Sequence, residues 1–116
     1  MAEIKIEMQK LPNGVILVKL KGFLDAYTYG EFEQTINNLF NQKMYKLVVD
    51  MTNVDYISSA GAGVFIGSIG VAQENQGNIV IVRPKPAVKE VFDLLGLSQI
   101  FPITTSMESA IKLLEA

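Results

Sequence analysis

The chain of 116 residues contains neither cysteine nor histidine. Without cysteine it has no disulfide, no thiolate metal ligand and no cysteine nucleophile. Without histidine it lacks the usual general base, the commonest zinc ligand and the central member of every Ser-His-Asp triad. We therefore expect a protein that is not an enzyme, with no catalytic residues, no metal site and no cofactor.

The chain also lacks an excess of charge of either sign. Ten basic and twelve acidic residues leave a net charge of −2, which offers no electrostatic attraction for nucleic acid or an anionic membrane. A hydrophobic fraction of 49% with 19% charged residues is typical of a compact fold,. At this length we expect one domain over residues 1–116. Residues 1–10 alternate charged and apolar side chains and do not resemble a signal peptide, so we expect a cytoplasmic protein.

Long hydrophobic segments are scarce as well. The longest uncharged run, residues 56–73, approaches the roughly 20 residues that a membrane-spanning helix needs. However, it contains Ser58, Ser59, Ser68 and four glycines. We therefore expect a buried helix with its preceding loop and no membrane insertion.

The first half of the chain shows strand and helix periodicities in turn. Apolar and polar residues alternate over 4–9, and Asn13-Gly14 is a strong hairpin signal, so residues 15–20 should pair antiparallel with the first strand,. Apolar residues at helical spacing predict a helix over 28–42. Residues 46–50 then form a short apolar run of strand type that ends in an acid.

The second half alternates helices and strands. In order, we expect a helix over 61–74 closed by Gly77, a central strand over 78–82, a helix from Pro86 to Gly96, a strand over 99–103, and a last helix opened by a capping box of Thr105 and Glu108,. The order ββαβαβαβα predicts an α/β fold with a mixed sheet of about five strands, right-handed crossovers and packed helices.

Polar residues gather at the expected carboxyl ends of the strands, where functional loops lie in such sheets. Asp50 ends one predicted strand and is followed by the loop that holds Ser58 and Ser59. Asp25 follows the second strand, and it shares this edge if that strand runs parallel to 46–50.

The paired serines admit several interpretations from local chemistry. A serine nucleophile needs a Gly-x-Ser-x-Gly elbow and a histidine, and neither is present,. A phosphate-binding loop needs a lysine soon after its glycines, but Gly63 is followed only by apolar residues. Either serine could cap the helix, and the glycines could serve close packing alone. Local chemistry leaves a helix cap and a regulatory site both open.

Three segments together resemble one known family. They are LVVDMTNVDYISSAGAGVFIG at 47–67, LKGFLDAYT at 20–28, and KPAVKEVFDLLGLSQIFPI at 85–103. Their sequences and separations resemble the STAS-domain anti-sigma factor antagonists of bacteria. The resemblance implies phosphorylation at Ser59, two residues before Gly61, with Ser58 as the alternative acceptor.

The resemblance also implies a function and a partner-binding surface. A typical member binds a serine-kinase anti-sigma factor and frees the sigma factor; the kinase phosphorylates it with ATP, and a phosphoserine phosphatase restores it. The partner-binding residues implied here are Asp25, Asp50, Ser58, Ala60, Gly61, Ala62, Gly63, Val64 and Phe65, with Asp25 and Asp50 flanking the acceptor. The alternative is a STAS scaffold or transport-associated subunit without a switch, which binds a nucleotide or a lipid.

Overall fold

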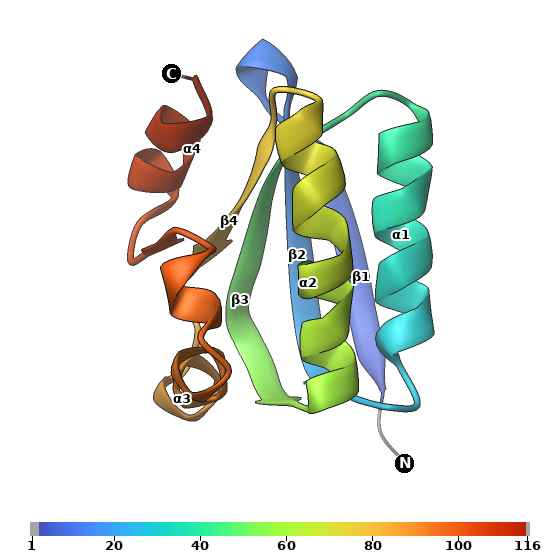
Figure 1. The fold of residues 1–116 in the computed structure, drawn as a ribbon, viewed down its shortest axis with the longest axis vertical. Helices are drawn as coiled ribbons and strands as arrows, with labels where there is room; N and C mark the ends of the chain where they lie inside the picture. The colour runs from blue at the N-terminus through green and yellow to red at the C-terminus, as the bar shows by residue number, and fades with distance from the viewer. Residues whose placement is uncertain (1–2, 116) are drawn as a thin grey trace.

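The computed structural model describes residues 3–115 and confirms the predicted order of strands and helices. The elements follow one another along the chain from the N-terminus to the C-terminus (Figure 1). They are β1 (Ile4–Lys10), β2 (Val15–Leu24), α1 (Tyr29–Asn41), β3 (Lys46–Ile57), α2 (Ser59–Glu74), β4 (Asn78–Val82), α3 (Pro86–Leu94), β5 (Ile103–Thr104) and α4 (Met107–Glu115).

The five strands form one mixed sheet in the order β1-β2-β3-β4-β5. β1 and β2 are antiparallel, and the three later pairs are parallel. The turn between β1 and β2 carries Asn13 and Gly14 with positive φ angles of 65° and 75°, a conformation that asparagine and glycine adopt most readily. The hairpin prediction is therefore confirmed.

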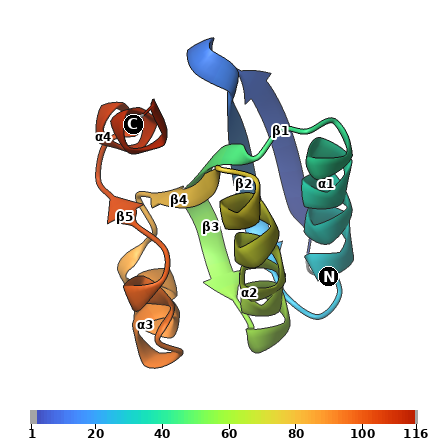
Figure 2. The same ribbon diagram turned by 45° about the horizontal axis from the view of Figure 1, so that its top comes forward.

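Three helices cover one face of the sheet and one helix covers the other. α1, α2 and α3 bury the larger core, in which Phe65 of α2 lies against Phe32, Phe92 and Phe101. α4 packs on the opposite face through Ala110 and Leu114 in a smaller core, and it stands apart from the other helices in Figure 2. Because α4 packs on β3, β4 and β5, and the core that it closes includes only Val15 and Leu17 of β2, the same face of β1 and of the rest of β2 stays open.

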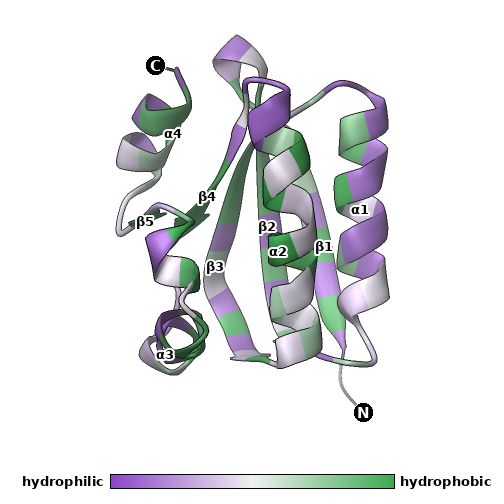
Figure 3. Cartoon of the chain, in the orientation of Figure 1, coloured by the Kyte–Doolittle hydropathy of each residue, from purple (hydrophilic) through white to green (hydrophobic). Residues whose placement is uncertain are grey.

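The helices differ in how their polar residues are distributed. In Figure 3, α1 is banded with hydrophilic residues, whereas α2 is pale or hydrophobic along most of its length and hydrophilic only near its C-terminal end. A helix that is apolar on all sides has no polar face to point toward solvent. The orientation of α2 is therefore set by its packing on the sheet.

Three predicted strand boundaries are wrong. β2 continues to Leu24, four residues beyond the predicted end at Leu20. β3 continues to Ile57, seven residues beyond the predicted end at Asp50. The strand predicted over 99–103 is only Ile103–Thr104, because residues 97–99 form a 3-10 turn that places Leu97 and Phe101 in the core.

The predicted ends of two helices also differ in detail. Ser106, not Thr105, caps α4: its Oγ accepts the Ser109 backbone N–H at 3.1 Å. After α2, the left-handed residue is Gln76 with φ 65°. Gly77 serves a different need, since a Cβ at this position would overlap the carbonyl oxygen of Tyr45.

We expect Gly77→Ala to destabilise the fold by about 1–3 kcal/mol, because the added methyl group must displace the backbone of Tyr45. Gly70→Ala is the matched control: a Cβ there meets nothing within 4 Å, so alanine should stabilise α2 by up to about 1 kcal/mol,. Urea unfolding followed by circular dichroism measures both changes. A shift of the same sign in the two variants would contradict this account of Gly77.

Candidate functional site

The carboxyl ends of β2 and β3 meet at one edge of the sheet. Leu24 at the end of β2 lies beside Ile57 at the end of β3, and the two strands are parallel. The next residue, Ser58, donates its backbone N–H to the carbonyl oxygen of Leu24 at 2.9 Å. The expectation that Asp25 shares an edge with the serines is therefore confirmed.

Ser58 caps α2. Its backbone is extended, with φ −99° and ψ 174°, and its Oγ accepts the backbone N–H of Gly61 at 3.2 Å. Its carbonyl oxygen accepts the N–H of Ala62. A Cβ on Gly61 would lie 2.5 Å from the Leu24 carbonyl oxygen, so glycine allows the first turn of α2 to approach the backbone of β2. The hydroxyl of the half-buried Ser58 is thus already engaged as the cap of α2.

Ser59 occupies the first position of α2 and is exposed. Across residues 3–115, no hydrogen bond involves its hydroxyl. The N-terminus of a helix carries a partial positive charge that favours an anionic group. The two serines therefore have different environments, one hydroxyl engaged as a cap and the other free at a helix N-terminus.

Asp25 lies in a hydrogen-bonded loop beside this helix start. Its Oδ1 accepts the backbone N–H groups of Tyr27 and Thr28 at 2.9 and 3.2 Å. The buried Thr28 hydroxyl donates to the Phe23 carbonyl oxygen and accepts the N–H of Asp25. These bonds hold the Asp25 carboxylate in one position, next to the chain that contacts Ser58.

Asp50 does not lie at this edge, so the expectation that it flanks the acceptor is wrong. It sits inside β3, next to Lys19 of β2 and Val82 of β4. Ile57 is seven positions further along β3, which at roughly 3.3 Å per strand residue is about 20 Å,. The Oδ1 of Asp50 accepts the backbone N–H and the hydroxyl of Thr52.

Most of the small and apolar residues expected on the partner-binding surface are buried instead. Val64 and Phe65 are 4% and 1% exposed, and Gly61 and Ala62 are also buried. They face the sheet because α2 lies on it through this side. Of the predicted residues in α2, only Ser59 and Gly63 are exposed, and Ala60 is half-buried.

Three apolar residues near this edge were missed. Phe23 is 43% exposed and Tyr56 is 50% exposed; they lie side by side on β2 and β3 with ring centroids 6.3 Å apart. Ile66 of α2 is 53% exposed. Once β3 is known to reach the buried Ile57, the exposure of Tyr56 can be predicted, because neighbouring strand residues point to opposite faces of the sheet.

The exposed side of α2 carries three glycines that the fold does not require. Gly63, Gly67 and Gly70 are solvent-exposed, and a Cβ on any of them would meet nothing within 4 Å. Each glycine inside a helix costs about 1 kcal/mol relative to alanine. Because glycine has no side chain, the backbone of α2 is exposed on both sides of Ile66, and this surface is uncharged. This glycine face (Gly63, Gly67 and Gly70) allows close approach of another backbone.

The site offers little for catalysis. In the part of the chain that the structure describes, no side-chain base is hydrogen-bonded to either serine, and no three acidic residues are grouped to hold a metal. No helix within residues 3–115 combines the length and the hydrophobicity that crossing a membrane demands. What the edge presents is an accessible hydroxyl on a helix that has no charged residue before Glu74.

Comparison with known proteins places the chain in a family. The model of the STAS domain matches residues 5–110. BtrV of Bordetella bronchiseptica, a proposed anti-sigma factor antagonist, is 31% identical over 107 residues, which are 92% of this chain and 91% of BtrV.

Solved structures have the same fold. A proposed anti-sigma factor antagonist from Thermotoga maritima superposes with a TM-score of 0.86 at 18% identity, over 96% of this chain and 95% of that one. The antagonist SpoIIAA in its unphosphorylated form gives 0.81 at 19% identity, over 92% and 93%. SpoIIAA of Bacillus in its phosphorylated form gives 0.74 at 18% identity, over 93% and 97%. The chain belongs to the STAS-domain family of anti-sigma factor antagonists.

Proposed function

We propose that this protein is a phosphorylation-controlled binding module. In its unphosphorylated form it binds a serine-kinase anti-sigma factor and thereby releases a sigma factor or another output. Phosphorylation of Ser59 by that kinase, with ATP, ends the binding, and a phosphoserine phosphatase restores it. The main support is the exposed, unengaged hydroxyl of Ser59 on an uncharged helix surface, in a family whose member SpoIIAA has been solved with and without phosphate.

The contact surface in this proposal combines the glycine face with Ile66, which supplies exposed apolar area on the same helix as Ser59. Tyr56 and Phe23 precede this edge on β3 and β2 and point to the opposite face of the sheet, because their neighbours Ile57 and Leu24 are buried under α2,. The glycine face lets a partner backbone come close without a side chain in between. Asp25, fixed at the same edge, is available to orient a basic group of the partner.

The switch depends on the free-energy cost of a phosphate on Ser59, which differs between the free protein and the complex. A phosphate on Ser59 adds a charge of about −1.5 to −2 at pH 7. In the free protein the helix N-terminus favours this anion by roughly 0.3–1 kcal/mol. In the complex, an unpaired phosphate inside a neutral interface loses its water at a cost of several kcal/mol. The free fold therefore tolerates the phosphate, whereas the complex does not.

The chemistry of phosphate transfer belongs to the partner in this proposal. Phosphoryl transfer depends on positioning and on Mg²⁺-assisted charge stabilisation around ATP. This chain contributes the accepting hydroxyl, and it has no histidine to activate it. The protein is thus a substrate of the kinase and not an enzyme.

We expect the cognate kinase and ATP to add one phosphate at Ser59, because this hydroxyl is exposed and free. Peptide mass spectrometry should detect it in the wild type and not in Ser59→Ala. Ser58→Ala is the matched control: it should still accept the phosphate while losing about 1 kcal/mol of stability with its cap. Phosphate on Ser58 in the wild type would refute the assignment.

A negative charge at position 59 should weaken the binding of this protein to the partner that recognises its unphosphorylated form. We expect Ser59→Asp to raise the Kd by at least about tenfold, the equivalent of 1.4 kcal/mol, and Ser59→Asn, of nearly the same shape, to bind within about threefold of the wild type. Isothermal titration calorimetry measures both. Equal affinity for the two variants would reject charge as the cause and favour a scaffold without a switch.

Methyl groups on the glycine face should have opposite effects on stability and binding. We expect Gly63→Ala and Gly67→Ala each to stabilise the free protein by up to about 1 kcal/mol, and to weaken partner binding because the methyl group separates the two surfaces. Thermal unfolding and calorimetric titration together measure these effects. If both substitutions stabilise the protein and leave the affinity unchanged, the partner does not contact this face.

A further inference from the structure

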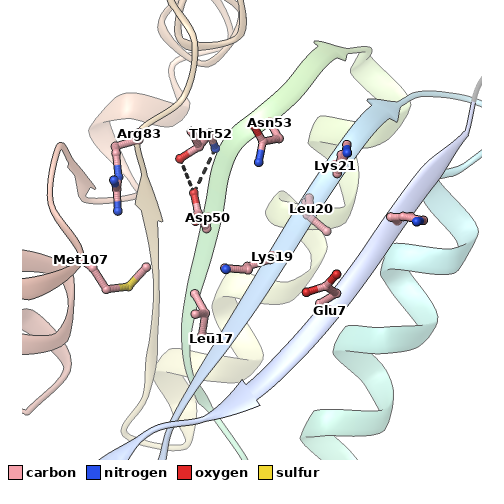
Figure 4. Close-up of a pocket in the computed structure, with 11 residues that line it drawn as sticks. Glu7, Leu17, Lys19, Leu20, Lys21, Asp50, Thr52, Asn53, Arg83 and Met107 are labelled. Atoms are coloured by element: carbon pink, nitrogen blue, oxygen red, sulfur yellow. Dashed lines mark hydrogen bonds between the residues drawn. The ribbon is translucent and has the colours of Figure 1, made fainter.

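A groove lies on the open face of the sheet, on the side opposite to α1, α2 and α3. It measures about 610 Å³ and extends from β1 and β2 across β3 to Arg83 and to Met107, the first residue of α4 (Figure 4). This volume is within the range of pockets that bind small molecules. The groove exists because α4 covers β3, β4 and β5 on this face, and its first residue, Met107, borders the part that is left uncovered.

Basic side chains dominate the groove although the chain as a whole is acidic. Four of its lining residues are basic, namely Lys5, Lys19, Lys21 and Arg83, and two are acidic, Glu7 and Asp50. The full chain has two more acidic residues than basic ones. The groove is therefore a positive region on a negatively charged protein.

The strand register places two of these cations directly opposite each other. Lys5 of β1 pairs with Lys21 of β2, and like charges at opposed positions destabilise a sheet,. Glu7 lies opposite Lys19, and the carboxylate of Asp50 is hydrogen-bonded to Thr52. The ion pairs found among residues 3–115 involve Lys85, Lys89 and Lys112 and none of the groove cations. An anion held between Lys5 and Lys21 would relieve their repulsion.

Arg83 brings a fourth cation to the other side of the groove. It follows β4 with φ 50°, a left-handed conformation that is uncommon outside glycine,. The hydrogen bond from its backbone N–H to the Thr104 carbonyl oxygen holds this turn in place. Its side chain lies beside β4 and lines the same groove as Asp50 and Thr52 (Figure 4). Arginine presents several donors in a planar arrangement that suits phosphate and carboxylate groups.

We propose that this groove binds a free small molecule with two or more phosphate or carboxylate groups. One anionic group lies between Lys5 and Lys21, and a second reaches Arg83, with the Thr52 hydroxyl and the Asn53 amide beside the path between them. A small ligand fits better than a nucleic acid or a membrane surface, because an extended polyanion would also meet the acidic remainder of the protein. The groove residues are separate from Ser59, so the proposal does not depend on the switch.

Titration with inorganic tripolyphosphate, and separately with citrate, tests the proposal and distinguishes phosphate from carboxylate recognition. We expect saturable one-to-one binding of at least one of them by calorimetry at low ionic strength. Perturbed amide signals in NMR spectra should include residues 19–21, 50–53 and 83. Ser59→Ala should bind as the wild type does, which separates this site from the proposed switch.

Substitutions of lysines on the two faces of the β1–β2 hairpin provide a comparison. The double variant Lys5→Gln with Lys21→Gln should weaken binding by about tenfold or more, since both charge-assisted hydrogen bonds are lost. Lys10→Gln removes a lysine from the opposite face of β1 and should change the affinity by less than about twofold. Thermal unfolding confirms that each variant is folded.

Several outcomes would overturn the proposal. They are no saturable binding of either probe at millimolar concentration, equal weakening by Lys10→Gln and the double variant, or NMR perturbations confined to the start of α2. Binding to phosphatidylserine vesicles or to duplex DNA without binding of the small probes would assign the groove to a different class of ligand and would overturn it as well.

Discussion

The arrangement of the site depends on one backbone contact, the hydrogen bond from Ser58 N–H to the carbonyl oxygen of Leu24. The absence of a Cβ on Gly61 lets the first turn of α2 lie directly against the end of β2. This contact holds the Asp25 loop next to the helix start. It also decides which hydroxyl is available: Ser58 turns inward as the cap, and Ser59, one residue later, is left facing solvent.

The fold keeps two chemically different surfaces apart. The surface of α2 that follows Ser59 carries no charged side chain before Glu74, so an added negative charge there changes its character most. The basic groove lies on the opposite face of the sheet, where α4, nine residues long, covers only part of the area. Its cations are therefore placed to hold a separate anion and not to neutralise one at the start of α2.

Much of the fold could be predicted because its signals are local. The Asn13-Gly14 turn, the helical spacing in α1 and the apolar run of β4 each depend on neighbouring residues alone, and the structure confirms them. The end of β3 could not be predicted in this way. Asp50 resembles a residue that ends a strand, but it is accommodated within β3 because its side of the sheet is open to solvent. Because β3 was predicted to end at Asp50, Asp50 was placed at the wrong edge of the sheet, and the outward orientation of Tyr56 was not predicted.

The sequence by itself determined the order of the elements, the paired hydroxyls at the start of α2 and the lack of a histidine or cysteine to catalyse a reaction, since these follow from residue identity and local spacing. Only the tertiary structure decided that Val64 and Phe65 are buried while Gly63 and Ile66 are exposed, because α2 is apolar on all sides and its rotation is set by packing. It alone also brought Lys5, Lys21 and Arg83 to one groove, since strand register and the position of α4 are properties of the folded sheet.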